Sequence, residues 1–163
     1  MISDKKIFLL GFMGSGKSTL GKKLAKKFEV PFFDLDNEIE KEVGATVSQI
    51  FEEKGEAYFR LLEQQILKQL IATDSVAVIA LGGGTPCFYD NMKLVNEAGT
   101  SVYIKYNAGI LCSRLINAKT ARPLIQNKSE QELKTFIENS LSERERFYLQ
   151  SKFIVEGNNI KVE

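Results

Sequence analysis

Apolar residues fall along the chain in two alternating patterns, short continuous runs and longer stretches with helical spacing. The runs at residues 6–10 and 76–81 predict strands that are buried on both faces. Between such runs, apolar residues recur at helical spacing, as at Leu20, Leu24 and Phe28, which predicts amphipathic helices. This alternation predicts an α/β fold, a parallel sheet covered by helices on both faces.

The same patterns place the other elements. We predict strands at residues 32–34, 101–106 and 153–155, with 160–162 extended beyond the last. Further helices are predicted at 47–71, divided near Gly55, and at 92–97 and 108–116. Two pairs fit capping boxes at helix starts: Thr46 with Gln49, and Ser129 with Glu132. No repeat or linker divides the 163 residues, so we expect a single domain.

Composition excludes several functional classes. The chain has 22 basic and 21 acidic residues and a net charge of +1, which argues against a nucleic-acid-binding surface. No signal peptide or membrane span is evident. Cys87 and Cys112 lack metal or redox spacing, so we expect reduced thiols in a cytoplasmic protein. The absence of histidine excludes Ser–His and Cys–His nucleophiles and histidine-ligated metals.

The segment from Gly11 to Ser18 fits the phosphate-binding pattern G-x-x-x-x-G-K-[ST]. Its position between a predicted strand and a predicted helix favours a phosphate site over a plain glycine-rich turn. Lys17 is expected to neutralise the outer phosphates, and the Ser18 hydroxyl to bind Mg²⁺. We therefore predict Mg·ATP binding by Gly11, Gly14, Ser15, Gly16, Lys17, Ser18 and Thr19.

Two carboxylates follow the predicted strand at 32–34, at the sheet edge where ligands bind in such folds. The strand at 76–81 ends at Gly82 with no carboxylate, so Asp34 is the best-placed acidic support for Mg²⁺. Asp36 is then free to meet a substrate hydroxyl. The alternative is that Asp36 caps a helix beginning near Asn37.

Arginines at three places could bind anions. Arg60 lies among apolar residues and suits a carboxylate, although a surface arginine or a partner of Glu56 is favoured from these residues alone. Arg122 lies in the polar stretch 117–128, which we expect to be a mobile loop able to close over a phosphate. Arg144 lies on a charged helix face. For Arg122 and Arg144 the alternative is simple solvation.

Three consecutive glycines, Gly82, Gly83 and Gly84, follow the strand predicted at 76–81. Without side chains they allow a ligand to approach the backbone closely, and their amides can bind anions or hydroxyls. The alternative is a plain tight turn, which the position at a strand's carboxyl end disfavours.

Taken in order, these segments resemble shikimate kinase. The P-loop is shared by many families, whereas the Gly-Glu-x-x-Phe-Arg segment, the triple glycine and the Arg-Pro-Leu segment are far more specific. The matching residues are Gly11 to Ser18, Asp34-x-Asp36, Gly55-Glu56-x-x-Phe59-Arg60, Gly82-Gly83-Gly84, Arg122-Pro123-Leu124, and Arg144 four residues before Tyr148.

The resemblance implies Mg²⁺-dependent transfer of the γ-phosphate of ATP to the 3-hydroxyl of shikimate, in aromatic amino-acid (chorismate) biosynthesis. It also implies a P-loop, nucleoside-monophosphate-kinase-like fold with five parallel strands, a lid at about residues 117–128 and a substrate-binding helical region at about 34–62. The partners it implies are ATP and shikimate, without nucleic acid or membrane, and we expect a monomer.

The resemblance also assigns roles to single residues. It implies that Lys17, Asp36 and Arg122 are catalytic, with Arg122 also contacting ATP. It implies that Ser18 and Asp34 support the metal, Asp34 through water. The implied shikimate-binding residues are Asp36, Arg60, Gly82, Gly83, Gly84 and Arg144.

Two features depart from the family pattern. Arg114 is offset by one residue from the position of the family's adenine-side arginine. The family usually has a helix after the last strand, and no such helix is predicted before Glu163. The residues that contact the adenine therefore stay unassigned. Other readings also stay open: a related metabolite kinase such as a gluconate kinase, a nucleotide-dependent switch, or an inactive relative. A guanine-specific Asn-Lys-x-Asp motif is absent, and every expected catalytic side chain is present.

Overall fold

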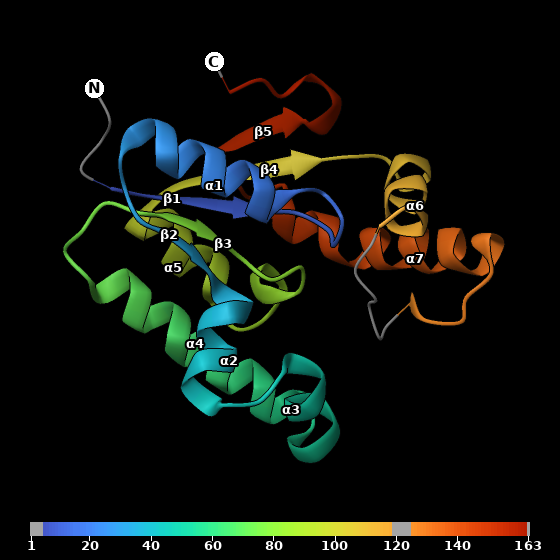
Figure 1. The fold of residues 1–163 in the computed structure, drawn as a ribbon, viewed down its shortest axis with the longest axis horizontal. Helices are drawn as coiled ribbons and strands as arrows, with labels where there is room; N and C mark the ends of the chain where they lie inside the picture. Colours follow the sequence, from blue (N-terminus) through green and yellow to red (C-terminus); the bar gives the residue numbers. More distant parts are fainter. Residues whose placement is uncertain (1–4, 119–124, 163) are drawn as a thin grey trace.

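The structure is a computed structural model that describes residues 5–118 and 125–162. A five-stranded parallel sheet runs in the order β2-β3-β1-β4-β5 (Figure 1). This confirms the predicted five-stranded parallel sheet. The strands are β1 (Lys6–Leu10), β2 (Phe32–Asp34), β3 (Val78–Ala80), β4 (Gly99–Lys105) and β5 (Phe153–Glu156).

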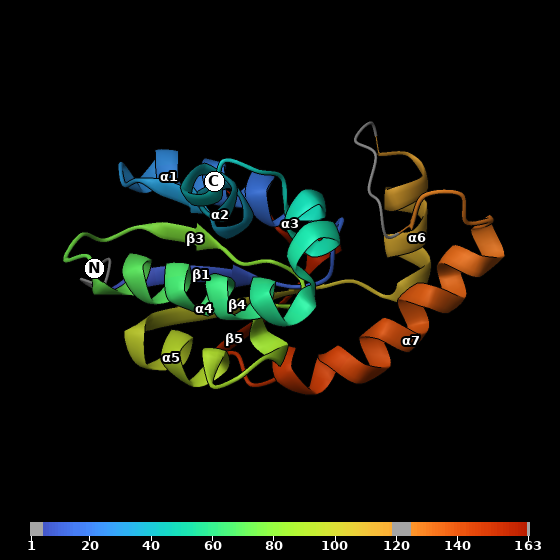
Figure 2. The ribbon, with the colours of Figure 1, turned by 90° about the horizontal axis from the view of Figure 1, so that it is seen from below.

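Helices lie on both sides of this sheet, as the sequence predicts. Figure 2 shows α1 on one side and α4 and α5 on the other, while α6 and much of α7 extend past the carboxyl edge of the strands. The helices are α1 (Lys17–Phe28), α2 (Leu35–Val43), α3 (Val47–Lys54), α4 (Glu56–Ala72), α5 (Asn91–Ala98), α6 (Ala108–Ile116) and α7 (Glu130–Tyr148), with short 3₁₀ turns η1 (Thr85–Cys87) and η3 (Gly157–Asn159).

The side-chain alternation of β1 explains the two covered faces. Successive residues of a strand point to opposite faces. Phe8 and Leu10 pack in a core with residues of α4 and α5, whereas Leu9 packs in a second core with Ala25 of α1. All three strand residues are fully buried, which fixes β1 in the centre of the sheet.

Helix starts follow the predicted capping signals. The Thr46 hydroxyl accepts a hydrogen bond from the Gln49 amide, and the Gln49 side chain accepts one from the Thr46 amide, so this capping box is confirmed. At the second predicted box the structure shows the Ser129 half, in which the hydroxyl accepts from the Glu132 amide. Gly55 ends α3 and precedes α4 with φ of 83°, so the division there is also confirmed.

Strand lengths differ from the prediction in two places. β3 spans only residues 78–80, the three residues that pair with both β1 and β2, so it is shorter than the predicted run at 76–81. Residues 160–162 do not join the sheet; the first of them, Ile160, has extended backbone directly after η3. In the described part of the chain, no helix is both long and apolar enough to cross a membrane.

Candidate active site

The loop between β1 and α1 curls around the side chain of Lys17. Gly14 and Gly16 have φ of 80° and 83°, the left-handed conformation that glycine adopts freely. The Lys17 ammonium donates hydrogen bonds to the carbonyls of Gly11 at 2.8 Å and Phe12 at 3.0 Å. The N-terminus of α1 and this ammonium together place positive charge at the loop, as phosphate binding requires.

Ser18 and Asp34 form a hydrogen-bonded pair beside the loop. The Ser18 hydroxyl donates to Asp34 Oδ2 at 2.5 Å, and Asp34 Oδ1 accepts from the Asn37 amide at 3.2 Å. Asp34 is therefore the N-cap of α2. The alternative in which Asp36 caps a helix near Asn37 is wrong, because α2 already begins at Leu35.

This pair also suits a magnesium ion shared with a nucleotide. Mg²⁺ is usually held by one or two carboxylates together with substrate phosphates, rather than by a cage of protein ligands. Within the described ranges 5–118 and 125–162, no three histidine, cysteine or acidic side chains gather in a way that could hold a metal alone. One hydroxyl and one carboxylate at the P-loop therefore fit the chemistry expected of Ser18 and Asp34.

Asp36 lies in the first turn of α2, between the P-loop and the triple glycine. A Cβ atom placed on Gly82 would lie 3.1 Å from Asp36 Oδ1, so the two are adjacent. Burial and the nearby carboxylates of Asp34 and Glu63 raise the pKa of Asp36 to about 6, while Lys17 opposes this rise. Such a carboxylate can accept a proton close to neutral pH.

Arg60 is 8% exposed and is held by two carboxylates of its own helix. Its Nη1 donates to Glu63 Oε1 at 2.9 Å, and its Nε to Glu56 Oε1 at 3.5 Å. The surface-arginine alternative is therefore wrong, and the expected Glu56 contact is the longer of the two. Glu63, which the sequence analysis missed, is 1% exposed and also accepts a hydrogen bond from the Thr85 hydroxyl at 2.9 Å.

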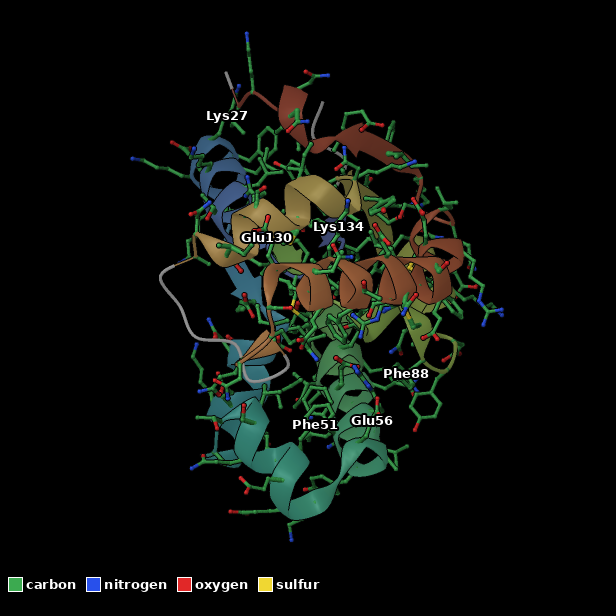
Figure 3. All side chains as sticks on the ribbon, turned by 90° about the vertical axis from the view of Figure 1, so that its right-hand side faces the viewer. Lys27, Phe51, Glu56, Phe88, Glu130 and Lys134 are labelled. Atoms are coloured by element: carbon green, nitrogen blue, oxygen red, sulfur yellow. The ribbon has the colours of Figure 1, made fainter. Side chains whose placement is uncertain are left out.

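Three phenylalanines surround the Arg60 guanidinium. Its central carbon lies 4.1 Å from the ring centre of Phe88, 5.2 Å from that of Phe59 and 5.8 Å from that of Phe51. Phe51 and Phe88 are labelled near the start of α4 in Figure 3. Cations are attracted to aromatic faces at these distances, so the rings and Glu63 together restrict the guanidinium to one orientation.

The Gly82–Gly84 turn brings Arg60 and Arg144 to neighbouring positions. A Cβ atom placed on Gly84 would lie 2.6 Å from Arg60 Nη2, and one on Gly83 would lie 3.3 Å from Arg144 Nη1. The absence of a side chain at Gly84 therefore allows Arg60 to approach the turn. Two guanidinium groups, from α4 and α7, reach consecutive residues of one turn, as expected for a shared carboxylate site.

The P-loop, the two aspartates and the turn open onto one cleft of about 510 Å³. Its lining includes Lys17, Ser18, Asp34, Asp36, Gly82 and Gly83. Segments far apart in the sequence thus meet at the carboxyl edge of the sheet, where ligands bind in open α/β folds.

Arg114, whose role the sequence left open, also lines this cleft. Its Nε donates to the Gly14 carbonyl at 2.6 Å, and its guanidinium lies 4.8 Å from the ring centre of Tyr106. Arg122, by contrast, lies outside the described residues, as do residues 119–124 of the predicted lid at 117–128.

Comparison with known proteins identifies the family. The family model for shikimate kinase matches residues 13–163 of the chain. The chain belongs to the shikimate kinase family. The shikimate kinase of Azobacteroides pseudotrichonymphae genomovar. CFP2 is 47% identical over 150 residues, covering 92% of this chain and 88% of that protein. Identity of this order over nearly the whole of both chains leaves the family assignment secure.

Solved shikimate kinases share the fold. The crystal structure of the enzyme from Bacteroides thetaiotaomicron has a TM-score of 0.92 and 43% identity, covering 98% of this chain and 90% of that chain. The Acinetobacter baumannii shikimate kinase, solved in complex with shikimate, has a TM-score of 0.84 and 32% identity, covering 93% and 83%. The resemblance is therefore confirmed for family and fold. As a member of this family the chain is an ATP-dependent enzyme of aromatic amino-acid biosynthesis, not a gluconate kinase or a nucleotide-dependent switch.

Proposed function

We propose that the chain transfers the γ-phosphate of ATP to the 3-hydroxyl of shikimate in the cleft between the P-loop and the Gly82–Gly84 turn. The observation that carries this proposal is the meeting of two kinds of anion site at one sheet edge. One is a loop that surrounds the Lys17 ammonium, and the other is a turn flanked by the guanidinium groups of Arg60 and Arg144. The first suits a polyphosphate and the second a planar carboxylate.

The nucleotide side consists of the loop and the start of α1. Mg²⁺, when bound, neutralises charge on the phosphates, with Ser18 and Asp34 supporting its shell. The hydrogen bond between these two side chains supports this role. The residues proposed to bind ATP are Gly11, Gly14, Ser15, Gly16, Lys17, Ser18 and Thr19, with Arg122 from the lid.

The acceptor side positions the hydroxyl. Arg60 and Arg144 hold the shikimate carboxylate, the turn contacts the ring substituents, and Asp36 hydrogen-bonds the reacting hydroxyl. In the transfer, the hydroxyl oxygen forms a bond to the γ-phosphorus, the bond from that phosphorus to the bridging oxygen of ADP breaks, and the hydroxyl proton passes to Asp36. Lys17 and Arg122 stabilise the charge of the transferring group.

The wider organisation follows from the sequence. We propose one catalytic domain across residues 1–163, with a lid at about 117–128 that closes over the phosphates and a substrate-binding helical region at about 34–62. The enzyme is proposed to be a cytoplasmic monomer whose partners are ATP and shikimate, without nucleic acid or membrane. Its nearly balanced charge and its two free cysteines support this view.

The proposal is tested by coupling ADP release to a spectroscopic assay with Mg·ATP. Turnover should depend on shikimate and be absent with gluconate and other hydroxy acids. Phosphorus NMR of the product should show a single phosphate ester at the 3-oxygen. ADP release that does not depend on shikimate, or a product phosphorylated at another hydroxyl, would refute the proposal. Removal of Mg²⁺ by EDTA should abolish turnover and serves as the metal control.

A further inference from the structure

Within the described chain, the three residues of the Gly82–Gly84 turn form hydrogen bonds through their carbonyl groups and not through their amides. The carbonyl of Gly82 accepts from the Thr85 amide at 3.2 Å, and that of Gly84 accepts from the Cys87 amide at 3.0 Å. The carbonyl of Gly83 accepts from the Tyr148 hydroxyl at 2.5 Å. In the part of the chain that the structure describes, the three glycine amides donate no hydrogen bond. The N–H groups of the three glycines can therefore donate to a ligand.

The bond from Tyr148 fixes one of these donors. In a trans peptide the C=O and the following N–H point in opposite directions, and the described chain has no cis bond. Anchoring the Gly83 carbonyl on Tyr148 therefore directs the Gly84 amide away from that side chain. Glycine is the residue with the widest choice of backbone conformations, so three in succession need such an external anchor.

Tyr148 is a rigid anchor. Its side chain is fully buried and lies against Tyr103, with ring centres 5.1 Å apart. Burial also raises the pKa of the Tyr148 phenol well above its usual value, an effect that Arg144 partly offsets, so the hydroxyl stays protonated and remains a donor.

Tyr148 also joins the turn to one of the two arginines. It is the last residue of α7 and lies one helical turn after Arg144, and it packs in the same core as residues of α4 and α5. Arg144 itself reaches Gly83. The hydroxyl of Tyr148 thus sets the position of the turn relative to the helix that carries Arg144.

We infer that Tyr148 is a positioning residue for the acceptor substrate: through the Gly83 carbonyl it holds the free amides of the turn in a fixed arrangement relative to Arg144, so that both face the bound shikimate. This inference rests on the proposed function, since it assigns the turn to shikimate. Tyr148 does not touch the reacting atoms, so its loss should weaken acceptor binding and leave the chemical step and nucleotide binding intact.

The chain offers a matched control in Tyr103. Its ring is the other member of the stacked pair and is equally buried, but its hydroxyl donates to Glu145 Oε1 at 3.3 Å and not to the turn. Y148F and Y103F each remove one buried hydroxyl while keeping both rings. Any general effect on packing or stability is therefore common to the two variants.

The experiment measures KM for shikimate, KM for ATP, kcat and the melting temperature in wild type, Y148F and Y103F. Y148F should raise KM for shikimate by about 3- to 10-fold, the effect expected for one hydrogen bond between neutral groups. KM for ATP and kcat should stay within about 2-fold, and Y103F should keep the wild-type KM for shikimate.

Three results would overturn the inference: an unchanged KM for shikimate in Y148F, an equal rise in both variants, or a Y148F protein that does not fold while Y103F does. Failure of the proposed function looks different, because wild type itself would then turn over without dependence on shikimate.

Discussion

The nucleotide half and the acceptor half of the proposed site are built in different ways. The P-loop is one continuous segment between β1 and α1, and Lys17 contacts carbonyls only five and six residues before it. The acceptor half joins Arg60 of α4, the turn after β3 and Arg144 of α7. Its central arginine is held by Phe88, Phe59, Phe51 and two glutamates.

This difference predicts different responses to substitution. In the P-loop the backbone forms the site, so a single side chain can be removed while the loop keeps its shape. In the acceptor half, the side chains that could bind a ligand also hold one another, so substitutions there should alter acceptor affinity and stability together.

The largest effect is expected for Lys17→Ala. Removal of the ammonium takes away charge stabilisation of the transferring phosphate, so kcat should fall by about 10²- to 10³-fold. Shikimate affinity should stay close to wild type, since the acceptor half is unchanged. Lys22→Ala, on the exposed face of α1, is the control and should retain full turnover. Turnover by Lys17→Ala at the wild-type rate would show that the loop does not hold the reacting phosphates.

The next largest effect concerns the two arginines. Arg60→Ala and Arg144→Ala should each raise KM for shikimate by about 10- to 100-fold, because a charge-assisted contact contributes about 1.5–3 kcal/mol. KM for ATP should change little. Arg60→Ala should also lower the melting temperature, since it leaves Glu63 buried without its cation. Arg146→Ala, on an exposed part of α7, is the control. An equal loss of ATP affinity would contradict the division into two halves.

Asp36→Asn should lower kcat by about 10-fold or more while sparing ATP binding, because the amide cannot accept the proton. A loose transition state needs little help from a base, so near-normal turnover by this variant at neutral pH would leave Asp36 only an orienting role.

The same variant should change the pH dependence of stability. The pKa of Asp36 is raised to about 6 from 3.8, so the folded protein binds this proton more tightly than the unfolded chain does. Stability must therefore fall as pH rises through the range between these two values. In the absence of metal and nucleotide, Asp36→Asn should be more stable than wild type by about 1–2 kcal/mol at pH 7.5. The difference should vanish below about pH 4. A variant less stable than wild type at pH 7.5 would contradict the assigned pKa.

The smallest effect is expected for Phe88→Leu. This change removes the aromatic face nearest to the Arg60 guanidinium, at 4.1 Å, while keeping an apolar side chain. A cation–π contact is worth about 0.5–1 kcal/mol or more, so KM for shikimate should rise by about 2- to 5-fold. Tyr58→Leu, on the exposed side of α4, should have no such effect. Equal KM values for wild type and Phe88→Leu would show that the Phe88 ring does not help to position Arg60.

The sequence predicts the local features of this molecule well. The P-loop, the capping box at Thr46 and the break at Gly55 depend on residues within a few positions of one another, and each appears where it was predicted. The length of β3 was wrong because it is set by pairing with β1 and β2, segments that are distant in the sequence. Whether Asp34 or Asp36 caps α2 also needed the structure, since both residues suit the position.

The acceptor half shows what local patterns leave out. Arg60 looked most like a surface residue, because the ring nearest to its guanidinium belongs to Phe88, far along the chain. Among the partners of Arg60 that the sequence analysis missed, Glu63 could have been found from spacing, because it lies three residues after Arg60 on the same helix. The link between Arg60, the turn and Arg144 came from the family resemblance and not from the residues themselves.

Whether Arg60 and Arg144 share the shikimate carboxylate can be measured by calorimetric binding of shikimate and of its carboxyl methyl ester. The ester should bind wild type about 10- to 100-fold more weakly than shikimate does, because it lacks the negative charge. In the double variant Arg60→Ala/Arg144→Ala, shikimate and the ester should bind equally weakly. If the double variant still prefers shikimate over the ester by the wild-type factor, the carboxylate is held elsewhere and the account is wrong.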